Sequence, residues 1–294
     1  MNPTGYLLAI GEALVDLLTT DFVADLSRAT TLRAVAGGSP ANLCRFAQAT
    51  GGQARLVAAV GQDGLGELLL RELAAAGLST SDIARLAGHA TSLIVVGRSQ
   101  ATPSFISYRG ADCELPPVPA ALLAGAAVVH TTAFALSRNP ARRHILAALA
   151  AAGAQGIPVA VDWNYAAPIW LPDDQSAAVW AEVIAHRPLL KVSLDDVARF
   201  AGIAPAADAA KAYLADAPTR ALCLTCGAGG VWFRAGQAGW QHQPAPPVAQ
   251  VHDATGAGDA FWAGFLTGWM RQAELAECVA AGQALAARRL QGHL

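Results

Sequence analysis

The segment 252–270, HDATGAGDAFWAGFLTGWM, sets two glycines, an alanine and an acid before an apolar helix. Aromatic residues recur at a spacing of four along that helix, and a parallel row of Ala and Gly predicts close packing against another element. The N–H groups of a first helical turn lack intrahelical partners and carry partial positive charge. Gly256, Ala257 and Gly258 are therefore expected to hold an anion such as a phosphate against bare backbone.

Asp259 follows this turn, where the amides and the helix dipole are expected to keep it ionised. A carboxylate beside a phosphate repels it, so the acid is useful mainly if it orients an attacking hydroxyl and accepts its proton. A weakly basic carboxylate is sufficient when the proton is transferred late in a loose phosphoryl-transfer transition state. The simpler alternative for a bare G-x-G-D is that Asp259 caps the helix and the glycines form a tight turn.

Other phosphate-binding motifs are excluded. The chain has two lysines, Lys191 and Lys211, and neither follows a glycine, so no P-loop is present and the strand lysine of protein kinases is missing. A dinucleotide fingerprint would need a third glycine where Phe261 stands. If ATP is used, backbone amides must make most of the contacts.

Composition favours a small-molecule ligand. The formal net charge is −2, with no basic stripe for nucleic acid and no polybasic tail for a membrane. Prolines and glycines interrupt the apolar runs 115–137 and 145–161, so neither is expected to span a bilayer. The N-terminus shows no signal-peptide pattern, which predicts a cytoplasmic protein. Five cysteines predict reduced thiols, and Cys223 and Cys226 are expected on opposite faces of a strand.

Strand and helix patterns alternate along the chain, which predicts an α/β fold with a mostly parallel sheet covered on both faces. Buried strands are predicted at 5–11, 54–61, 126–132, 157–163 and 220–226, and helices at 39–52, 65–78, 139–153 and 174–187. The segments 91–99 and 103–110 break this order as a hairpin with a polar turn. With 30–35 they predict a small accessory sheet.

Three segments together make a resemblance specific: DATGAGDAFWAGF, AGGSPANLCRFAQATGG and AAVGQDGLGELLLREL. They resemble the C-terminal and N-terminal signatures of the ribokinase-like (phosphofructokinase B) carbohydrate kinases, and further landmarks follow in order along nearly the whole chain. The resemblance implies a single three-layer α/β/α domain over 1–294 with a β lid from about 12–36 and 90–112. It also implies ATP-dependent phosphorylation of a primary hydroxyl, and a homodimer formed through the lid.

The same resemblance implies roles for individual residues. Asp259 would be the catalytic base, and the amides of Gly256, Ala257 and Gly258 would stabilise the transferring phosphoryl group. Carboxylate and amide groups suit sugar hydroxyls, and glycines let backbone approach the ring. The substrate-binding residues implied are Asp16, Gly37, Gly38, Asn42, Phe105, Arg109 and Asn164, with Tyr108 also in the lid. Without the resemblance, Asn42 could equally be a polar first-turn residue, and the lid residues could be simple packing.

On the nucleotide side the resemblance implies Lys191, Ser193, Thr225, Gly227, Gly230 and Thr255. Mg²⁺ is assigned to Asp196, and Asp253 marks where the family places a monovalent cation such as K⁺ when it uses one. Three positions depart from the family: Ser193…Asp196 replaces N-x-x-E, Ala166 replaces an arginine, and Ala280 replaces an asparagine near adenine. These changes weaken the nucleotide-side assignments most.

GEALVDLL and YRGAD look most like fructokinases, so the expected reaction is fructose to fructose 6-phosphate. The alternatives are 2-keto-3-deoxygluconate, whose carboxylate would favour Arg109, and then a ribose or nucleoside substrate. A different class, a non-catalytic sugar-binding regulator, stays open because of the altered Ser193…Asp196 motif. The intact 256–259 turn argues against it, since a sensor has little use for the base.

Overall fold

The computed structural model describes residues 1–294 except 1–4, 22, 24, 98–103, 171–173 and 294. Its described residues form a main sheet of nine strands in the order β13-β12-β11-β10-β9-β8-β1-β4-β5. All neighbouring pairs are parallel except those of β12 with β11 and β13. The strands are β1 Tyr6–Ile10, β4 Ala54–Gly61, β5 Ile83–Leu86, β8 Ala126–Thr132, β9 Val159–Asp162, β10 Leu189–Ser193, β11 Ala221–Thr225, β12 Val231–Ala235 and β13 Gln241–Gln243.

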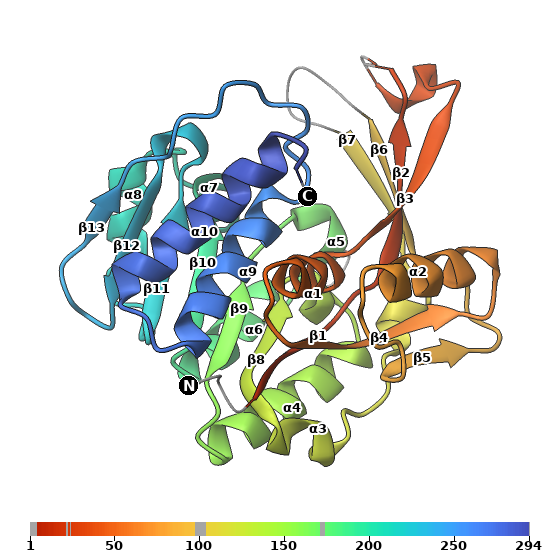
Figure 1. The fold of residues 1–294 in the computed structure, drawn as a ribbon, viewed down its shortest axis with the longest axis horizontal. Helices are drawn as coiled ribbons and strands as arrows, with labels where there is room; N and C mark the ends of the chain where they lie inside the picture. Colours follow the sequence, from red (N-terminus) through yellow and green to blue (C-terminus); the bar gives the residue numbers. More distant parts are fainter. Residues whose placement is uncertain (1–4, 22, 24, 98–103, 171–173, 294) are drawn as a thin grey trace.

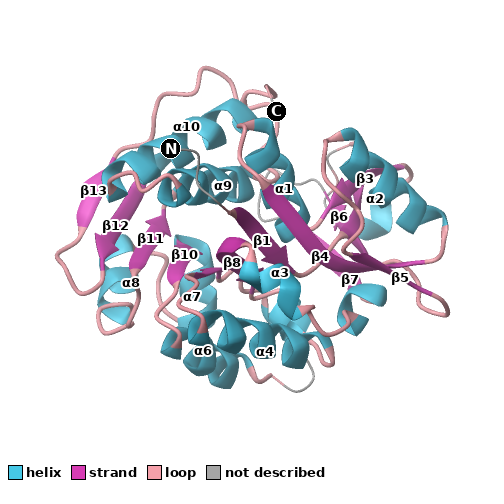
Figure 2. Ribbon diagram, turned by 60° about the horizontal axis from the view of Figure 1, so that its bottom comes forward, coloured by secondary structure: helices cyan, strands magenta, loops and turns pink. Residues whose placement is uncertain are grey.

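Helices cover both faces of this sheet, as Figure 2 shows. The apolar side chains of each helix join one of two separate cores, one on each face. One face carries α1 Ser39–Ala49, α2 Gly64–Ala75, α9 Ala257–Met270 and α10 Leu275–Leu290. The other carries α3 Ala120–Ala124, α4 Ala141–Ala154, α5 Ala167–Trp170, α6 Ser176–Ala185, α7 Leu194–Ala201 and α8 Ala207–Tyr213. The predicted three-layer α/β/α fold is confirmed.

Helices α9 and α10 pack very closely, side by side in Figure 1. A methyl group on Gly264 would lie 2.6 Å from the Ala281 carbonyl oxygen, and one on Gly282 would lie 2.6 Å from that of Phe261. The small residues thus allow backbone-to-backbone contact, as the Ala/Gly row predicts. The position of α9, and of the turn before it, is therefore tied to α10.

A second sheet of four strands stands apart from the body, at the upper right of Figure 1. Its order is β3-β2-β6-β7, and its strands are β2 Leu14–Thr19, β3 Leu32–Gly37, β6 Leu93–Gly97 and β7 Ser104–Tyr108. The accessory sheet predicted from the sequence is confirmed, although the turn expected between β6 and β7 lies outside the described residues. We call this sheet the lid sheet.

None of the described helices is both long and apolar enough to cross a bilayer. The cysteines behave as expected: Cys223 is buried in one core, whereas Cys226 packs against the other. Both thiols are free. The prediction that they face opposite sides of a strand is confirmed.

Candidate active site

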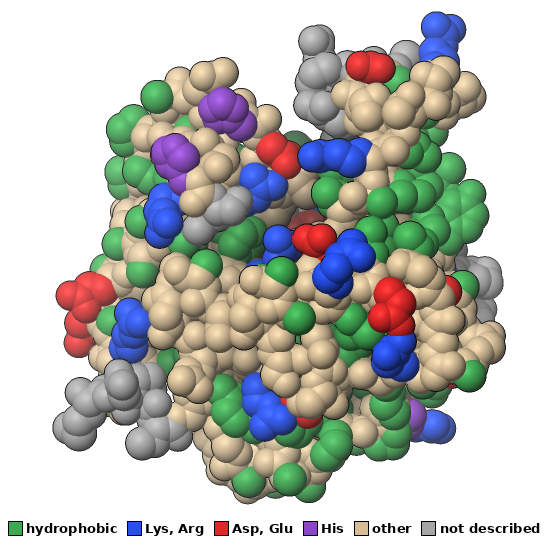
Figure 3. All heavy atoms as spheres, turned by 45° about the vertical axis from the view of Figure 1, so that its right-hand side comes forward, with side chains coloured by type: hydrophobic (Ala, Val, Ile, Leu, Met, Phe, Trp, Pro, Cys, Tyr) green, Lys and Arg blue, Asp and Glu red, His purple; other side chains and the backbone are tan. Residues whose placement is uncertain are grey.

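The parallel strands end together at one edge of the main sheet, where polar side chains gather. The register pairs Thr132 with Asp162 between β8 and β9, and Ser193 with Thr225 between β10 and β11. In open α/β sheets this carboxyl edge is where ligands bind. Figure 3 shows a hollow between the lid sheet and the body, with acidic and basic side chains gathered around it.

Asp259 lies in the first turn of α9 but does not cap its own helix. Its Oδ1 accepts a hydrogen bond from Ser39 Oγ at 2.6 Å, and its Oδ2 accepts one from Asn42 Nδ2 at 3.0 Å. Both donors belong to α1, so the helix-capping alternative is wrong. Burial raises the pKa of Asp259 despite these donors and the nearby Lys191. The expectation that the helix terminus makes it a weak base is therefore wrong, because burial outweighs the groups that favour the ionised form.

The turn before Asp259 is built as an anion site, with one difference from the prediction. Gly256 is the N-cap residue of α9 and has φ of 75°, a left-handed conformation that favours glycine. The Ala257 N–H is engaged, since it donates to the Ala254 carbonyl at 3.1 Å. Within the described part of the chain the N–H groups of Gly256, Gly258 and Asp259 have no backbone partner, so these three amides remain for a ligand. Thus Ala257 closes the turn in this structure.

Asp16 faces Asp259 from the lid sheet. Burial, and then the charge of Asp259, raise the pKa of Asp16 to about 7. A methyl group on Gly37 would lie 2.1 Å from Asp16 Oδ2, and one on Gly38 would lie 2.5 Å from the Glu12 carbonyl oxygen. Gly38 also has φ of 96°. These two glycines therefore give room to neighbouring protein groups, in addition to the approach to a sugar ring that the sequence suggests.

Glu12 is a residue that the sequence analysis missed. Its carboxyl group accepts hydrogen bonds from the Ser39 N–H at 3.2 Å and from Thr132 Oγ1 at 2.9 Å. Burial raises its pKa to about 8. Glu12 thus ties the start of α1, which carries both donors to Asp259, to the end of β8. The sequence offered one sign of this residue, namely an acid next to the apolar strand residues in GEALVD.

Arg109 and Asn164 both contact Phe134. The Arg109 guanidinium lies 4.0 Å from the Phe134 ring centroid, and Asn164 Oδ1 accepts the Phe134 N–H at 3.1 Å. Arg109 is not free: its Nε donates to Asp112 Oδ2 at 2.7 Å and its Nη1 to Ser137 Oγ at 2.9 Å. Its side chain is only 8% exposed. Asp112 therefore pairs with this charge, although Nη2, which lies 2.5 Å from Asp112 Oδ2, makes no hydrogen bond with the described residues.

The two aromatic residues predicted for the lid face opposite ways. Asp16 pairs with Ile94, and Ile94 pairs with Ser107, so these three side chains lie on one face of the lid sheet. Phe105 is two residues before Ser107 and lies on the same face, because successive side chains of a strand point to opposite faces. Tyr108 lies on the outer face and is 57% exposed. Phe105 therefore lies on the side of the candidate site, whereas Tyr108, which belongs to the lid sheet as expected, lies on the other side.

Lys191 is buried in the middle of β10, and its side chain lies beside the turn. Its Nζ donates to Asp162 Oδ2 at 2.6 Å, and a methyl group on Gly258 would lie 3.1 Å from it. Burial lowers the pKa of Lys191, but Asp162, Asp196 and Asp259 together raise it above its usual value, so it stays charged. Asp162, also missed from the sequence, keeps its pKa near 6 because burial raises it and Lys191 lowers it. A buried ammonium group thus adds to the backbone amides at this turn.

Ser193 and Asp196 form a capping box at the start of α7. The Ser193 hydroxyl donates to Asp196 Oδ2, and Oδ1 of the same carboxylate accepts from Arg199 at 2.6 Å. Both oxygens of Asp196 have protein partners, so its Mg²⁺ role stays a prediction. Among the described residues no cluster of three or more His, Cys, Asp or Glu could hold a metal by itself.

Thr225 ends β11 at the same sheet edge, and the loop that follows it to β12 holds Gly227 and Gly230. Gly227 and Gly230 have φ of 54° and 84°. A methyl group on Gly230 would lie 2.3 Å from the Gln243 carbonyl oxygen, which explains the second glycine. Their role toward a nucleotide stays a prediction.

Asp253 and Thr255 form the loop that leads into the turn. Asp253 Oδ1 accepts the Thr255 N–H at 2.9 Å, and Oδ2 accepts from Arg289 Nη2 at 2.8 Å. Arg289 lies in the last turn of α10 and was also missed from the sequence. The contact between Arg289 and Asp253 depends on the packing of α10 against α9, so the sequence alone does not reveal it.

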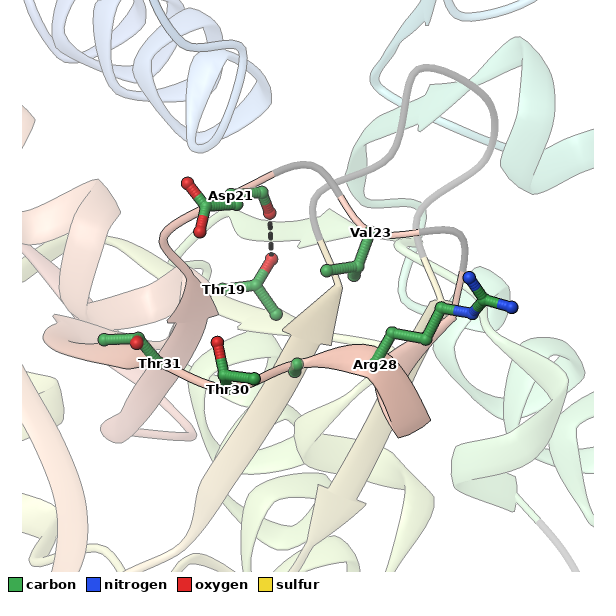
Figure 4. A pocket seen from close by; sticks show the side chains of 7 residues that line it. Thr19, Asp21, Val23, Arg28, Thr30 and Thr31 are labelled. Carbon is green, nitrogen blue, oxygen red and sulfur yellow. Dashed lines mark hydrogen bonds between the residues drawn. The ribbon is translucent and has the colours of Figure 1, made fainter.

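A pocket at the far end of the lid sheet is separate from these groups (Figure 4). In it Thr19 Oγ1 donates to the Asp21 carbonyl oxygen at 2.8 Å. Its lining residues are Thr19, Asp21, Val23, Arg28, Ala29, Thr30 and Thr31. None of the predicted site residues lines it, so the carboxyl edge remains the candidate site.

The known proteins that this chain resembles are carbohydrate kinases. The model of the pfkB family carbohydrate kinases matches residues 4–293. An ATP-dependent 6-phosphofructokinase of Thermoanaerobacterium thermosaccharolyticum is 30% identical over 97% of this chain and 88% of its own length. The solved fructokinase of Halothermothrix orenii has a TM-score of 0.85 at 30% identity, covering 96% and 98% of the two chains. The fructokinase of Xylella fastidiosa, solved with bound ATP, has a TM-score of 0.82 at 25% identity, covering 98% and 92%.

Proposed function

This chain belongs to the pfkB family of carbohydrate kinases, and from that premise we propose that it transfers the γ-phosphoryl group of ATP to the 6-hydroxyl of fructose. The observation that carries the proposal is the position of Asp259. Its carboxylate is held by Ser39 and Asn42, lies next to first-turn amides, and faces Asp16 on the lid sheet.

The reaction follows from these positions. The sugar oxygen attacks the γ-phosphorus while the bond to the β-phosphate oxygen breaks, and Asp259 takes the hydroxyl proton. Charge on the transferring group is stabilised by the amides of Gly256, Gly258 and Asp259 and by the Lys191 ammonium. The raised pKa of Asp259 suits a base that must hold a proton after transfer. Asp16, with Asn42, would orient the sugar hydroxyls.

One buried carboxylate oxygen at the carboxyl edge of the main sheet is suited to bind Mg²⁺. Asp162 Oδ1 is buried and, within the described part of the chain, has no hydrogen-bond partner. Mg²⁺ usually binds proteins through one or two carboxylates and takes its other ligands from phosphates and water. Asp162 and Asp196 are the carboxylates that would hold it, and when bound it would neutralise charge on the phosphates. Lys191 positions Asp162 for this role through their ion pair.

The partners of Arg109 favour a neutral sugar over a sugar acid. A substrate carboxylate such as that of 2-keto-3-deoxygluconate would need an available cation, but Asp112 already neutralises Arg109. The acidic groups Asp16 and Glu12 have raised pKa values and supply no positive charge. Acidic and neutral hydrogen-bonding groups suit a polyhydroxyl ligand.

A second candidate substrate is fructose 6-phosphate, with its 1-hydroxyl as the acceptor. One relative is a 6-phosphofructokinase. Arg33 is exposed and pairs with Leu18, which sets it on the same face of the lid sheet as Asp16. A guanidinium there could bind a distal phosphate. Comparing turnover of fructose with that of fructose 6-phosphate, in the native chain and in Arg33→Ala, separates the two substrates.

The lid sheet supports a homodimer as part of the proposal. Three large apolar side chains on its outer face are exposed: Leu32 at 42%, Ile106 at 46% and Tyr108 at 57%. Exposed apolar groups gathered on one face favour association with another protein surface. A second copy of the chain, covering this face, would also hold the lid sheet in place over the sugar.

The decisive experiment measures ADP formation with a panel of sugars, ATP and Mg²⁺. Turnover with fructose is expected, and Asp259→Asn should lower kcat by about 10²- to 10⁴-fold because it removes the base. Asp195→Asn is the matched control, since Asp195 is an exposed acid in the first turn of α7. Tight sugar binding without ADP formation would instead favour a regulatory sugar-binding protein.

A further inference from the structure

Arg289 connects the C-terminal helix to the loop before the phosphate-binding turn. Its Nη2 lies 2.8 Å from Asp253 Oδ2. A methyl group on Gly256 would lie 3.8 Å from its Nε. The side chain is only 17% exposed. The guanidinium therefore lies between the Asp253 carboxylate and the first residue of the turn.

The backbone around Arg289 is held firmly. The His252 N–H donates to the Leu290 carbonyl at 2.8 Å, which joins the loop to the end of α10. Along their length α9 and α10 are in backbone contact at Gly264 and Gly282. The positive charge of Arg289 thus has a nearly fixed place relative to Asp259, whose pKa it helps to lower against the larger effect of burial.

Asp253 does not fit a monovalent cation in this chain. Both of its oxygens are engaged, one by the Thr255 N–H and the other by Arg289. Its negative charge is already neutralised, and a second cation beside the guanidinium would be repelled. The assignment of K⁺ to Asp253 therefore disagrees with the contacts of that residue.

We propose that Arg289 is a built-in cation of this kinase. It positions the turn 256–258 through Asp253 and makes turnover independent of added K⁺. Arg289 is a positioning residue here, because it acts on the phosphate through the loop and the turn. The inference rests on the proposed kinase function, but it can fail while that function holds.

The test compares the native chain with Arg289→Met, Arg289→Lys and Arg288→Met, in K⁺ and in tetramethylammonium at constant ionic strength. Arg288 is the matched control, since it is the exposed neighbour on the same helix. The readouts are kcat, the KM values for ATP and sugar, and the melting-temperature shift caused by ATP.

The native chain should turn over equally well in both salts. Arg289→Met should raise the KM for ATP and lower kcat by up to about a hundredfold, the cost of a misplaced reacting group, with little change in the KM for sugar. It should also lose most of the ATP-induced shift in melting temperature and recover part of its rate in K⁺. Arg289→Lys should keep most of the activity, and Arg288→Met should match the native chain.

Stimulation of the native chain by K⁺, or native kinetics in Arg289→Met, would overturn the proposal. If Arg289→Met does not fold, the K⁺ response of the native chain and the kinetics of Arg289→Lys and Arg289→Gln decide. If no sugar is turned over by any variant, the kinase proposal fails, whereas the ATP-induced melting shifts still test Arg289.

Discussion

The hydroxyl of Ser39 should set the pH at which this kinase becomes active. Ser39 Oγ lies 2.6 Å from Asp259 Oδ1, on a carboxylate whose pKa burial has already raised. The proposed base works only when ionised, so activity falls as the pH drops through its pKa. Ser39→Ala removes a donor to the ionised form and should raise that pKa further.

The size of the shift follows from the bond. A hydrogen bond to a charged acceptor contributes about 1.5–3 kcal/mol, and one pKa unit corresponds to about 1.36 kcal/mol. Asn42 keeps its bond to Oδ2 in the variant. The acidic limb of kcat/KM for the sugar should therefore move upward by about one to two pH units. At high pH the variant should approach the native rate, because Asp259 is then ionised in both.

The assay is a pH profile of kcat/KM for the native chain, Ser39→Ala and Ser39→Thr, with ADP formation as the readout. Ser39→Thr retains the hydroxyl and should keep the native limb. An equal loss of rate at every pH in Ser39→Ala would refute the reasoning, since it would mean that Ser39 orients Asp259 without tuning its pKa. An unshifted profile would show that Asp259 is not the titrating group.

Three further predictions test other parts of the site. Gly37→Ala should raise the KM for sugar by about tenfold or more and leave the KM for ATP unchanged. The added methyl group would lie 2.1 Å from Asp16 Oδ2 and displace that carboxylate. Equal changes in both KM values would contradict this prediction. Folding favours the protonated form of Glu12, so this contribution to the unfolding free energy is complete below the unfolded pKa near 4.5 and is lost as pH rises toward about 8. Glu12→Gln should therefore flatten the pH dependence of the unfolding free energy in this range, measured by denaturant titration. An unchanged slope would show that Glu12 is ionised in the folded protein. Ile106→Glu should convert the dimer to a monomer, with the molar mass measured by light scattering. The control Tyr213→Ser changes a similarly exposed residue on α8 and should leave the dimer intact. A monomeric mass for the native chain would contradict the proposed interface.

The sequence by itself determined the layers of the fold and the turn of the site. Alternating strand and helix patterns predict the three layers, and the glycines before Asp259 predict a short turn that leads into a helix, as found at Gly256 and α9. These are properties of short segments, since residue spacing and backbone preference act within a few positions. The Ala/Gly row of α9 likewise predicted close packing, although not the partner helix.

Only the tertiary structure decided which side chains meet. Ser39 and Asn42 reach Asp259 from more than 200 positions away, and the pKa that results is opposite in direction to the local expectation. Lys191 lies beside Gly258 because β10 ends at the same sheet edge as the turn, and Arg289 reaches Asp253 because α10 packs on α9. Such contacts depend on strand order, register and helix placement. No local pattern encodes these, so burial and charge pairing at the site could not be predicted from the sequence.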